Sequence, residues 1–388
     1  MSEERIGVGI IGANVNYGFG SRAHIPALRQ LPEYRLAAVC TTRQDTADET
    51  AKAYDIPLAF SDVQAMVVDP SVDLVTVCVR VPAHYAYVRM AIAAGKHVYC
   101  EWPLGANLAE VKELNAIAVA QGVQHLIGLQ GRGSPAVNYM KDLIAGGFVG
   151  EVVSASMVAT LSDAGQRPGF NVWGYEHRNG AGTLHIPAGH CLDLLCYVAG
   201  EFAELSALVD VQVKQPLPGS AGQGIRIDTP DQVLVQGRLT NGAVVSAHIQ
   251  TAPVASKNMS FEVHGTEGML VATGDWLWMQ DIGLQGLRSG SKPAEQTYDN
   301  PWGNLGAKNV VEPNVLTPMP VPDSYRWVPA AMPGGLAYSV GQLYRRFGDA
   351  ILKGDTWHPD FAVAGKRASL LATIERASVT ASRQKCDQ

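Results

Sequence analysis

The chain of 388 residues has no long apolar run, and acidic residues stand near its start, where a secretory signal would carry positive ones. A membrane-spanning helix needs about 20 consecutive, mostly apolar residues. No stretch of this sequence approaches that length. The sequence therefore predicts a soluble, cytoplasmic protein with no membrane partner.

Runs of like charge are also missing. With 30 Lys and Arg against 36 Asp and Glu, the formal net charge is -6. Proteins that bind nucleic acids or anionic membranes carry clustered Lys and Arg. We therefore expect no nucleic-acid partner and a small molecule as the ligand.

Paired cysteines are absent as well, and no C-x-x-C occurs. The six cysteines are Cys40, Cys78, Cys100, Cys191, Cys196 and Cys386. Four of them stand in or beside apolar runs, which is typical of buried, reduced thiols. No group of His, Asp and Glu has the spacing of metal ligands, so the sequence predicts no metal centre.

A glycine-containing segment stands at the N-terminus, where residues 5–28 read RIGVGIIGANVNYGFGSRAHIPAL. The run 6–11 predicts a strand that ends at Gly12, and a helical pattern begins soon after Gly18. Glycines there let backbone N–H groups and a helix N-terminus approach a pyrophosphate. The spacing differs from G-x-G-x-x-G, so taken alone the segment fits a nucleotide loop or a structural turn equally well.

Strand and helix patterns alternate from residue 5 to about 130, which predicts a doubly wound parallel sheet of the Rossmann type. Beyond Gly150 the expected strands are farther apart, and Asn241-Gly242 predicts a hairpin. The expected fold is α/β, with a Rossmann domain over 1–133. Residues 134–388 would form an α+β domain with a large, mostly antiparallel open sheet for substrate binding and oligomerisation. Its last helices would pack back on the first domain.

The end of the second expected strand decides the cofactor in such folds. An acidic residue there binds the ribose 2′-hydroxyl of NAD. Here the residues are Thr41, Thr42 and Arg43, which favour NADP over NAD. A surface arginine at a helix start is the alternative interpretation of Arg43.

Four later segments carry a family resemblance. They are VRVPAHY at 79–85, EWP at 101–103, LQGRGSP at 129–135 and GHCLDLL at 189–195. Together with the glycine loop they resemble the Gfo/Idh/MocA family of glucose-fructose oxidoreductase and inositol dehydrogenase. The spacing from Gly12 to Gly18 is most similar to the branch of the fungal galactose-pathway repressor.

The glycine loop, the strand ends and the resemblance together give a set of expected cofactor-binding residues. They are Gly12, Asn14, Gly18, Phe19, Thr41, Thr42, Arg43, Val81, Pro82, His84, Glu101, Trp102 and Gln130. His84 has an alternative role as a residue at a helix start with no chemistry.

The resemblance also implies the catalytic residues. Family dehydrogenases usually read Glu-Lys-Pro where this chain has Trp102, and an indole cannot replace the proton-transferring ammonium. It can stack on a ring. His190 matches the family histidine, but Ile186 stands where an Asp is common, and His185 could take its polar role. We therefore expect His190 and His185 to be catalytic, although helix histidines often serve structure alone.

Substrate contacts are expected from aromatic and polar side chains that suit a sugar ring. They are Trp102, Arg132, Trp173, Tyr175, His185 and His190. Packing at a domain interface is the alternative for Trp173. Farther on, Trp276 and Trp278 stand at strand spacing, and the stretch 299–323 indicates an ordered loop.

The resulting hypothesis is an NAD(P)-dependent oxidoreductase that moves hydride between nicotinamide and a hydroxyl or carbonyl carbon. Its substrate would be sugar-like, a polyol or aromatic, and the chain would form a dimer or tetramer through its second sheet. Two alternatives remain open. One is a non-catalytic regulator like the galactose-pathway repressor, and the other is a lyase that oxidises its substrate transiently.

Overall fold

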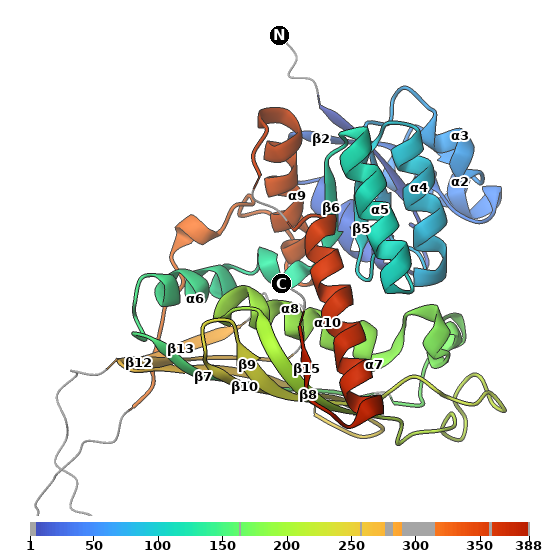
Figure 1. The fold of residues 1–388 in the computed structure, drawn as a ribbon. Helices are drawn as coiled ribbons and strands as arrows, with labels where there is room; N and C mark the ends of the chain where they lie inside the picture. Colours follow the sequence, from blue (N-terminus) through green and yellow to red (C-terminus); the bar gives the residue numbers. More distant parts are fainter. Residues whose placement is uncertain are drawn as a thin grey trace, which may run out of the picture.

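The computed structural model describes residues 5–162, 164–256, 258–275, 282–288, 315–356 and 359–386. Trp276, Trp278 and the greater part of the stretch 299–323 lie outside these ranges. The described elements form two sheets, each with its own helices; α9 (Leu336–Lys353) lies beside the first sheet, and α10 (Phe361–Thr380) runs from the first sheet's helices to the second sheet (Figure 1).

The first sheet has six parallel strands in the order β3-β2-β1-β4-β5-β6. Its strands are β1 (Ile6–Ile11), β2 (Tyr34–Cys40), β3 (Leu58–Phe60), β4 (Leu74–Val77), β5 (His97–Glu101) and β6 (His125–Gly128). All side chains of β1, β4 and β6 are buried. Because helices cover both faces of the sheet, the sequences of these strands are almost continuously apolar. The predicted Rossmann-type sheet is confirmed.

Short helices connect these strands. They are η1 (Gly20–His24), α1 (Ile25–Leu28), α2 (Gln44–Tyr54), α3 (Val63–Val67), η2 (Val81–Ala83), α4 (His84–Ala93) and α5 (Leu108–Gln121). The helical pattern after the glycine loop begins as a π-helix, η1, and continues as α1. A Cβ at Gly20 would lie 2.8 Å from Sγ of Cys78 and 2.9 Å from Cα of Ala13, so this helix starts unusually close to the sheet.

The second sheet has nine strands in the order β14-β13-β12-β11-β7-β10-β9-β8-β15. They are β7 (Val152–Ser162), β8 (Phe202–Asp210), β9 (Gln232–Leu239), β10 (Val244–Ala252), β11 (Asn258–Gly265), β12 (Gly268–Gly274), β13 (Gly283–Arg288), β14 (Thr317–Pro318) and β15 (Gln384–Lys385). The β7 and β10 pair is parallel, and the other pairs are antiparallel. The predicted hairpin at Asn241-Gly242 is confirmed, because Gly242 has φ +88° and joins β9 to β10.

Helices cover one face of this sheet (Figure 1). They include α6 (Pro135–Ala145), α7 (Gly182–His185), α8 (Pro187–Ala199) and α10 (Phe361–Thr380). On the opposite face Val158, His248, Leu234 and Leu208 stand side by side across β7, β10, β9 and β8. The three apolar members of this row are exposed by 36% to 58%. We call these four residues the outer row.

The two C-terminal helices pack back on the first sheet and its helices, and α10 also contacts the second sheet. Helix α9 (Leu336–Lys353) buries Val340, Leu343, Tyr344 and Phe347 in the same apolar cluster as β1. Helix α10 packs between β8 and α5. Across the described ranges, no helix combines the length and the apolar character that a membrane span requires.

Candidate cofactor and active site

The glycine loop lies at the carboxyl end of β1. Gly12 has φ +98° and its N–H donates to the carbonyl oxygen of Cys40 at 2.9 Å. A Cβ at this position would lie 2.5 Å from the carbonyl oxygen of Cys78. Gly18 has φ +113°, and its Cβ would lie 3.2 Å from the carbonyl oxygen of Gly12. The loop is thus a shape that only glycine tolerates at these two positions.

Asn14 shapes the same loop from within. Its Oδ1 accepts the N–H of Asn16 at 2.9 Å, and its backbone forms an isolated bridge with Tyr17. Phe19 precedes η1, and its ring meets the edge of His24 at a centroid distance of 5.5 Å. The structure therefore gives Asn14 and Phe19 defined roles in forming the loop, beside the expected contact with the cofactor.

The end of β2 carries the three residues expected to select the cofactor. Oγ1 of Thr41 lies 2.7 Å from Oγ1 of Thr46, while Thr42 is exposed. Nε of Arg43 donates to Oδ1 of Asp45 at 3.0 Å, and both side chains are about two-thirds exposed. Such surface pairs contribute about 0–1 kcal/mol. Arg43 therefore remains free to exchange this partner for a phosphate.

Val81 and Pro82 lie in η2, directly after β4, and His84 opens α4. The His84 ring is buried, with Nδ1 at 2.7 Å from the carbonyl oxygen of Pro103 and Nε2 at 3.1 Å from that of Val79. Burial lowers the pKa of His84. Its ring thus braces the end of β4 against the turn that follows β5, which fits the structural alternative.

Glu101 and Gln130 meet where β5 and β6 end. Nε2 of Gln130 donates to Oε2 of Glu101 at 2.7 Å. Because a carboxylate only accepts, this contact fixes the orientation of the amide. The other amide atom, Oε1 of Gln130, is buried and has no hydrogen-bond partner among the described residues. Such an atom is costly to bury unless a ligand donates to it.

His24 and Tyr344 complete this group, and no pattern in the sequence predicts a role for either residue. Nε2 of His24 lies 3.1 Å from Oε1 of Glu101, and its Nδ1 lies 2.9 Å from the hydroxyl of Tyr344. The same hydroxyl lies 2.7 Å from Oγ1 of Thr76 on β4. A chain of polar side chains therefore runs from Glu101 into the core between the parallel sheet and α9.

Trp102 follows β5 and is 5% exposed. Its indole N–H donates to the carbonyl oxygen of His185 at 2.7 Å. A Cβ on Gly189 would lie 2.4 Å from the indole nitrogen, so α8 passes directly against this ring. The single donor of Trp102 is therefore used within the protein, and the ring packs between β5 and the start of α8.

The two candidate catalytic histidines have different surroundings. His190 lies on α8 as a partly exposed residue, and no described residue forms a hydrogen bond with its ring. Burial lowers the pKa of His190 to about 4, against a smaller opposing effect of Glu101. By contrast, Nδ1 of His185 lies 3.2 Å from the carbonyl oxygen of Ala181, and its ring faces that of His177. The structure thus gives His185 and His190 different neighbours.

Arg132 was expected at the substrate, but its guanidinium forms a bidentate ion pair. Nε and Nη2 donate to the two carboxylate oxygens of Asp193 at 2.9 and 2.7 Å. Arg367 of α10 approaches the same carboxylate at 3.7 Å and also pairs with Glu201. Because Asp193 is buried between two guanidinium groups, this cluster connects the end of β6 with α8 and α10.

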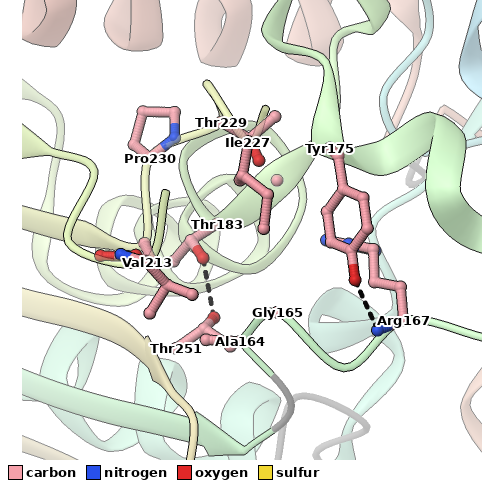
Figure 2. Close-up of a pocket in the computed structure, with 12 residues that line it drawn as sticks. Ala164, Gly165, Arg167, Tyr175, Thr183, Val213, Ile227, Thr229, Pro230 and Thr251 are labelled. Carbon is pink, nitrogen blue, oxygen red and sulfur yellow. Dashed lines mark hydrogen bonds between the residues drawn. The ribbon is translucent and has the colours of Figure 1, made fainter. Parts of the chain in front are cut away.

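Tyr175 and Trp173 lie in η4 (Gly169–Tyr175), apart from the group at Glu101. Tyr175 is 1% exposed, and its hydroxyl accepts the backbone N–H of Arg167 at 3.0 Å. Figure 2 shows it beside a pocket with Thr183 and Thr251, whose hydroxyl oxygens are 2.7 Å apart. The cavity measures about 30 Å³, roughly one water molecule, so it does not admit a sugar.

Comparisons with known proteins agree with this geometry. Residues 6–129 match the oxidoreductase family with an NAD-binding Rossmann fold, and residues 135–274 match the Gal80p C-terminal domain. The galactose/lactose metabolism regulatory protein GAL80 of Saccharomyces cerevisiae is 28% identical over 291 residues, which span 70% of this chain and 67% of that protein. The dehydrogenase AclE of Aspergillus oryzae is 28% identical over 291 residues, which span 72% of this chain and 80% of that protein.

A solved structure shares the fold over nearly the whole length. Levoglucosan dehydrogenase in complex with NADH and levoglucosan superposes with a TM-score of 0.82 at 22% identity, covering 99% of this chain and 100% of that chain. The two tandem matches span the glycine loop, Glu101 and helix α8. This chain therefore belongs to the Gfo/Idh/MocA oxidoreductase family, near its Gal80 branch.

Proposed function

We propose that this protein is an NAD(P)-dependent oxidoreductase that transfers hydride between nicotinamide and a hydroxyl or carbonyl carbon of a sugar-like, polyol or aromatic small molecule. The observation that carries the proposal is the free ring of His190. It is partly exposed, has no hydrogen-bond partner among the described residues, and has its pKa lowered to about 4. The ring is therefore neutral at physiological pH and able to accept a proton.

The residues present fit a dinucleotide. The loop at Gly12 would not accommodate a side chain, as a pyrophosphate cradle requires. The unpaired Oε1 of Gln130 offers a buried acceptor of the kind that a carboxamide NH₂ would satisfy. When bound, the nicotinamide supplies the hydride chemistry. We keep NADP as the preferred form because Thr41, Thr42 and Arg43 provide hydroxyls and a guanidinium in place of an acidic residue.

The protein's own contribution is to orient the substrate and to move a proton. An imidazole nitrogen of His190 would accept the hydroxyl proton as the substrate is oxidised, and would return it in the reverse direction. Trp102 would form an apolar wall held by its bond to the carbonyl of His185. Glu101 is fixed by Gln130 and His24 and would give this edge a negative charge close to the reacting groups.

The test is a screen of NADPH and NADH absorbance against sugars, polyols and aromatic carbonyls, with substrate analysis by mass spectrometry. We expect turnover in the wild type and its loss in His190→Asn, while His264→Asn on β11, outside the outer row, serves as the matched control. Tight cofactor binding without any change in either absorbance or substrate mass would reject the proposal.

One observation favours a second function, that of a non-catalytic regulator. Trp102 stands where family dehydrogenases usually have lysine, and its only donor is already used by His185. A regulator predicts that NAD(P) binds, that no substrate reacts, and that the nucleotide changes the affinity for a protein partner. A lyase would instead show a changed substrate mass without net change in NAD(P)H, so the same screen distinguishes all three.

The outer row supports a homo-oligomer. Val158, Leu234 and Leu208 present exposed apolar side chains on adjacent strands, and a second copy of the same sheet could cover them. We expect Leu234→Arg to convert the oligomer to monomers in sedimentation velocity. The exposed Val379→Arg on α10 is the control, and an unchanged sedimentation coefficient in Leu234→Arg would contradict this interface.

A further inference from the structure

Three possible metal ligands meet between the C-terminal helix and the segment before α8. His177 lies in η5 (His177–Asn179), His185 in α7 and Glu375 in α10. One ligand atom from each lies within 4.8 Å of the other two. Local spacing could not reveal this group, because Glu375 is 190 positions from His185. The sequence-based expectation of no metal centre considered only such spacing.

The contacts within the cluster prepare its side chains as ligands. Nε2 of His177 lies 2.8 Å from Oε1 of Glu375, and the rings of His177 and His185 lie 5.1 Å apart at 54°. Nδ1 of His185 faces the carbonyl oxygen of Ala181 at 3.2 Å. A proton on Nδ1 would satisfy that carbonyl and leave the lone pair on Nε2 free. Metal-binding histidines commonly donate their other ring N–H to a backbone carbonyl in this way.

One ring nitrogen of the cluster is left without a hydrogen bond by the described residues. Nδ1 of His177 is buried and has no hydrogen-bond partner among the described residues. The segment is nevertheless anchored, because the backbone N–H of His177 donates to Oδ1 of Asp228 at 2.6 Å. The side chains of His177 and Glu375 are 39% and 35% exposed, so an ion can reach them from solvent.

We propose that His177, His185 and Glu375 bind one divalent transition-metal ion, with Zn²⁺ as the preferred ion. Two imidazoles and one carboxylate form a known zinc ligand set, and three protein ligands leave a fourth position for water. Tetrahedral ligands at about 2.0–2.1 Å from zinc lie roughly 3.3 Å apart. Side-chain rotations would bring the present separations, which run from 2.8 Å between His177 and Glu375 to at most 4.8 Å, to that value.

The ion would act as a clamp on the active-site side of the molecule. It would join α10 to η5 and α7, and α7 directly precedes the helix that carries His190. The carbonyl of His185 also accepts the indole N–H of Trp102. Zinc binding would therefore fix the segment that supports both Trp102 and the start of α8. This proposal is independent of hydride transfer, since it needs neither cofactor nor substrate.

The experiment uses the full chain, stripped with a chelator and then titrated with Zn²⁺ by calorimetry, with metal content measured after dialysis. We expect about one bound equivalent in the wild type. Glu375→Gln and His177→Asn should each weaken binding about tenfold or more. His264→Asn is the matched control, because His264 pairs with Glu262 at 3.3 Å on the second sheet and has no third ligand in the described structure.

A second measurement uses only the wild type, so it tests the proposal even if the variants fail to fold. Co²⁺ added to the wild type should give the intense visible bands of a four-coordinate site, and Zn²⁺ should abolish them. A weak spectrum typical of hydrated Co²⁺ would overturn the proposal. So would zinc affinity that is equal in the wild type, Glu375→Gln, His177→Asn and His264→Asn. A melting temperature that rises with Zn²⁺ in the wild type and not in Glu375→Gln would support the clamp.

Discussion

The carboxyl edge of the parallel sheet and the segment 164–190 are held in place by different means. At the sheet edge, backbone groups and strand ends define the geometry, as in the contact from Gly12 to Cys40. The segment 164–190 depends instead on side chains from elsewhere, including Trp102, Asp228 and Glu375. The geometry of the first region is therefore set before any ligand binds. The geometry of the second region depends on how distant parts of the chain pack against it.

The strongest test of this contrast removes the buried ion-pair cluster that connects the sheet edge with α8, the helix in which the segment 164–190 ends. Asp193→Ala would leave the buried guanidinium groups of Arg132 and Arg367 without their shared carboxylate. Breaking a buried ion pair costs about 3–5 kcal/mol, so we expect the free energy of unfolding in denaturant to fall by that amount. Glu204→Ala, which breaks a more exposed pair with Arg383, is the control and should cost less than about 1 kcal/mol. Equal losses would show that the buried cluster does not connect the two regions.

A second prediction separates chemistry from binding. His190→Asn should lower kcat by about 10²–10⁴ because it removes the proton acceptor. The dissociation constant of NADPH should remain unchanged, since the sheet edge is untouched. Rapid-kinetic absorbance for the turnover and fluorescence titration for the cofactor measure the two quantities. Parallel loss of both would mean that His190 supports the cofactor site.

The sheet edge itself is tested at Gly12. Gly12→Ala places a Cβ 2.5 Å from the Cys78 carbonyl at φ +98°, so we expect cofactor affinity to fall by about a hundredfold. Gly95→Ala is a matched control, because Gly95 has φ +72° but open space around its missing Cβ. That variant should lose about 1–2 kcal/mol of stability and keep its affinity. Comparable affinity losses in fluorescence titration would show that backbone strain, not the close contact, is responsible.

Cofactor choice is expected to depend on a weaker contact. Arg43→Ala should reduce NADPH affinity about tenfold and leave NADH affinity nearly constant, because only the 2′-phosphate needs the guanidinium. Calorimetric titration with both cofactors gives the ratio. A uniform decrease for both would assign Arg43 to the surface pair with Asp45 alone.

The last prediction concerns the pH dependence of stability, where the change per pH unit is small. The folded pKa of His190 is about 4 against an ordinary value of 6.5, so the unfolded chain binds more protons between these values. Stability should therefore fall as pH decreases through this window, with a contribution of at most about 1.4 kcal/mol per pH unit. Denaturant unfolding of His190→Asn should show a shallower decline than the wild type. An identical pH profile would mean that the ring is not desolvated.

Local rules were sufficient for the backbone of the sheet edge and insufficient for the side chains of His24 and Tyr344 that meet there and for the other region. The strand ending at Gly12 and the Asn241-Gly242 hairpin follow from backbone requirements of adjacent residues, and both could be predicted. The different environments of His185 and His190 could not, because the neighbour of His185 that matters, Glu375, comes from the last helix. The ion pair of Arg132 could not be predicted either, because its carboxylate partner, Asp193, stands 61 positions later in the chain.

Tyr344 has a consequence for how such a protein can evolve. Its buried hydroxyl lies within hydrogen-bond distance of His24 and Thr76. Its backbone carbonyl oxygen accepts a hydrogen bond from the hydroxyl of Tyr34, with 2.7 Å between the two oxygens. The nucleotide half is thus completed by a helix encoded about 300 codons downstream. A recombination event that exchanged only the first 133 residues could replace the residues at positions 24, 34 and 76. Tyr344 would then lose the hydrogen-bond partners that it has in this chain. Inheritance of the N-terminal half therefore requires coordinated change near the C-terminus.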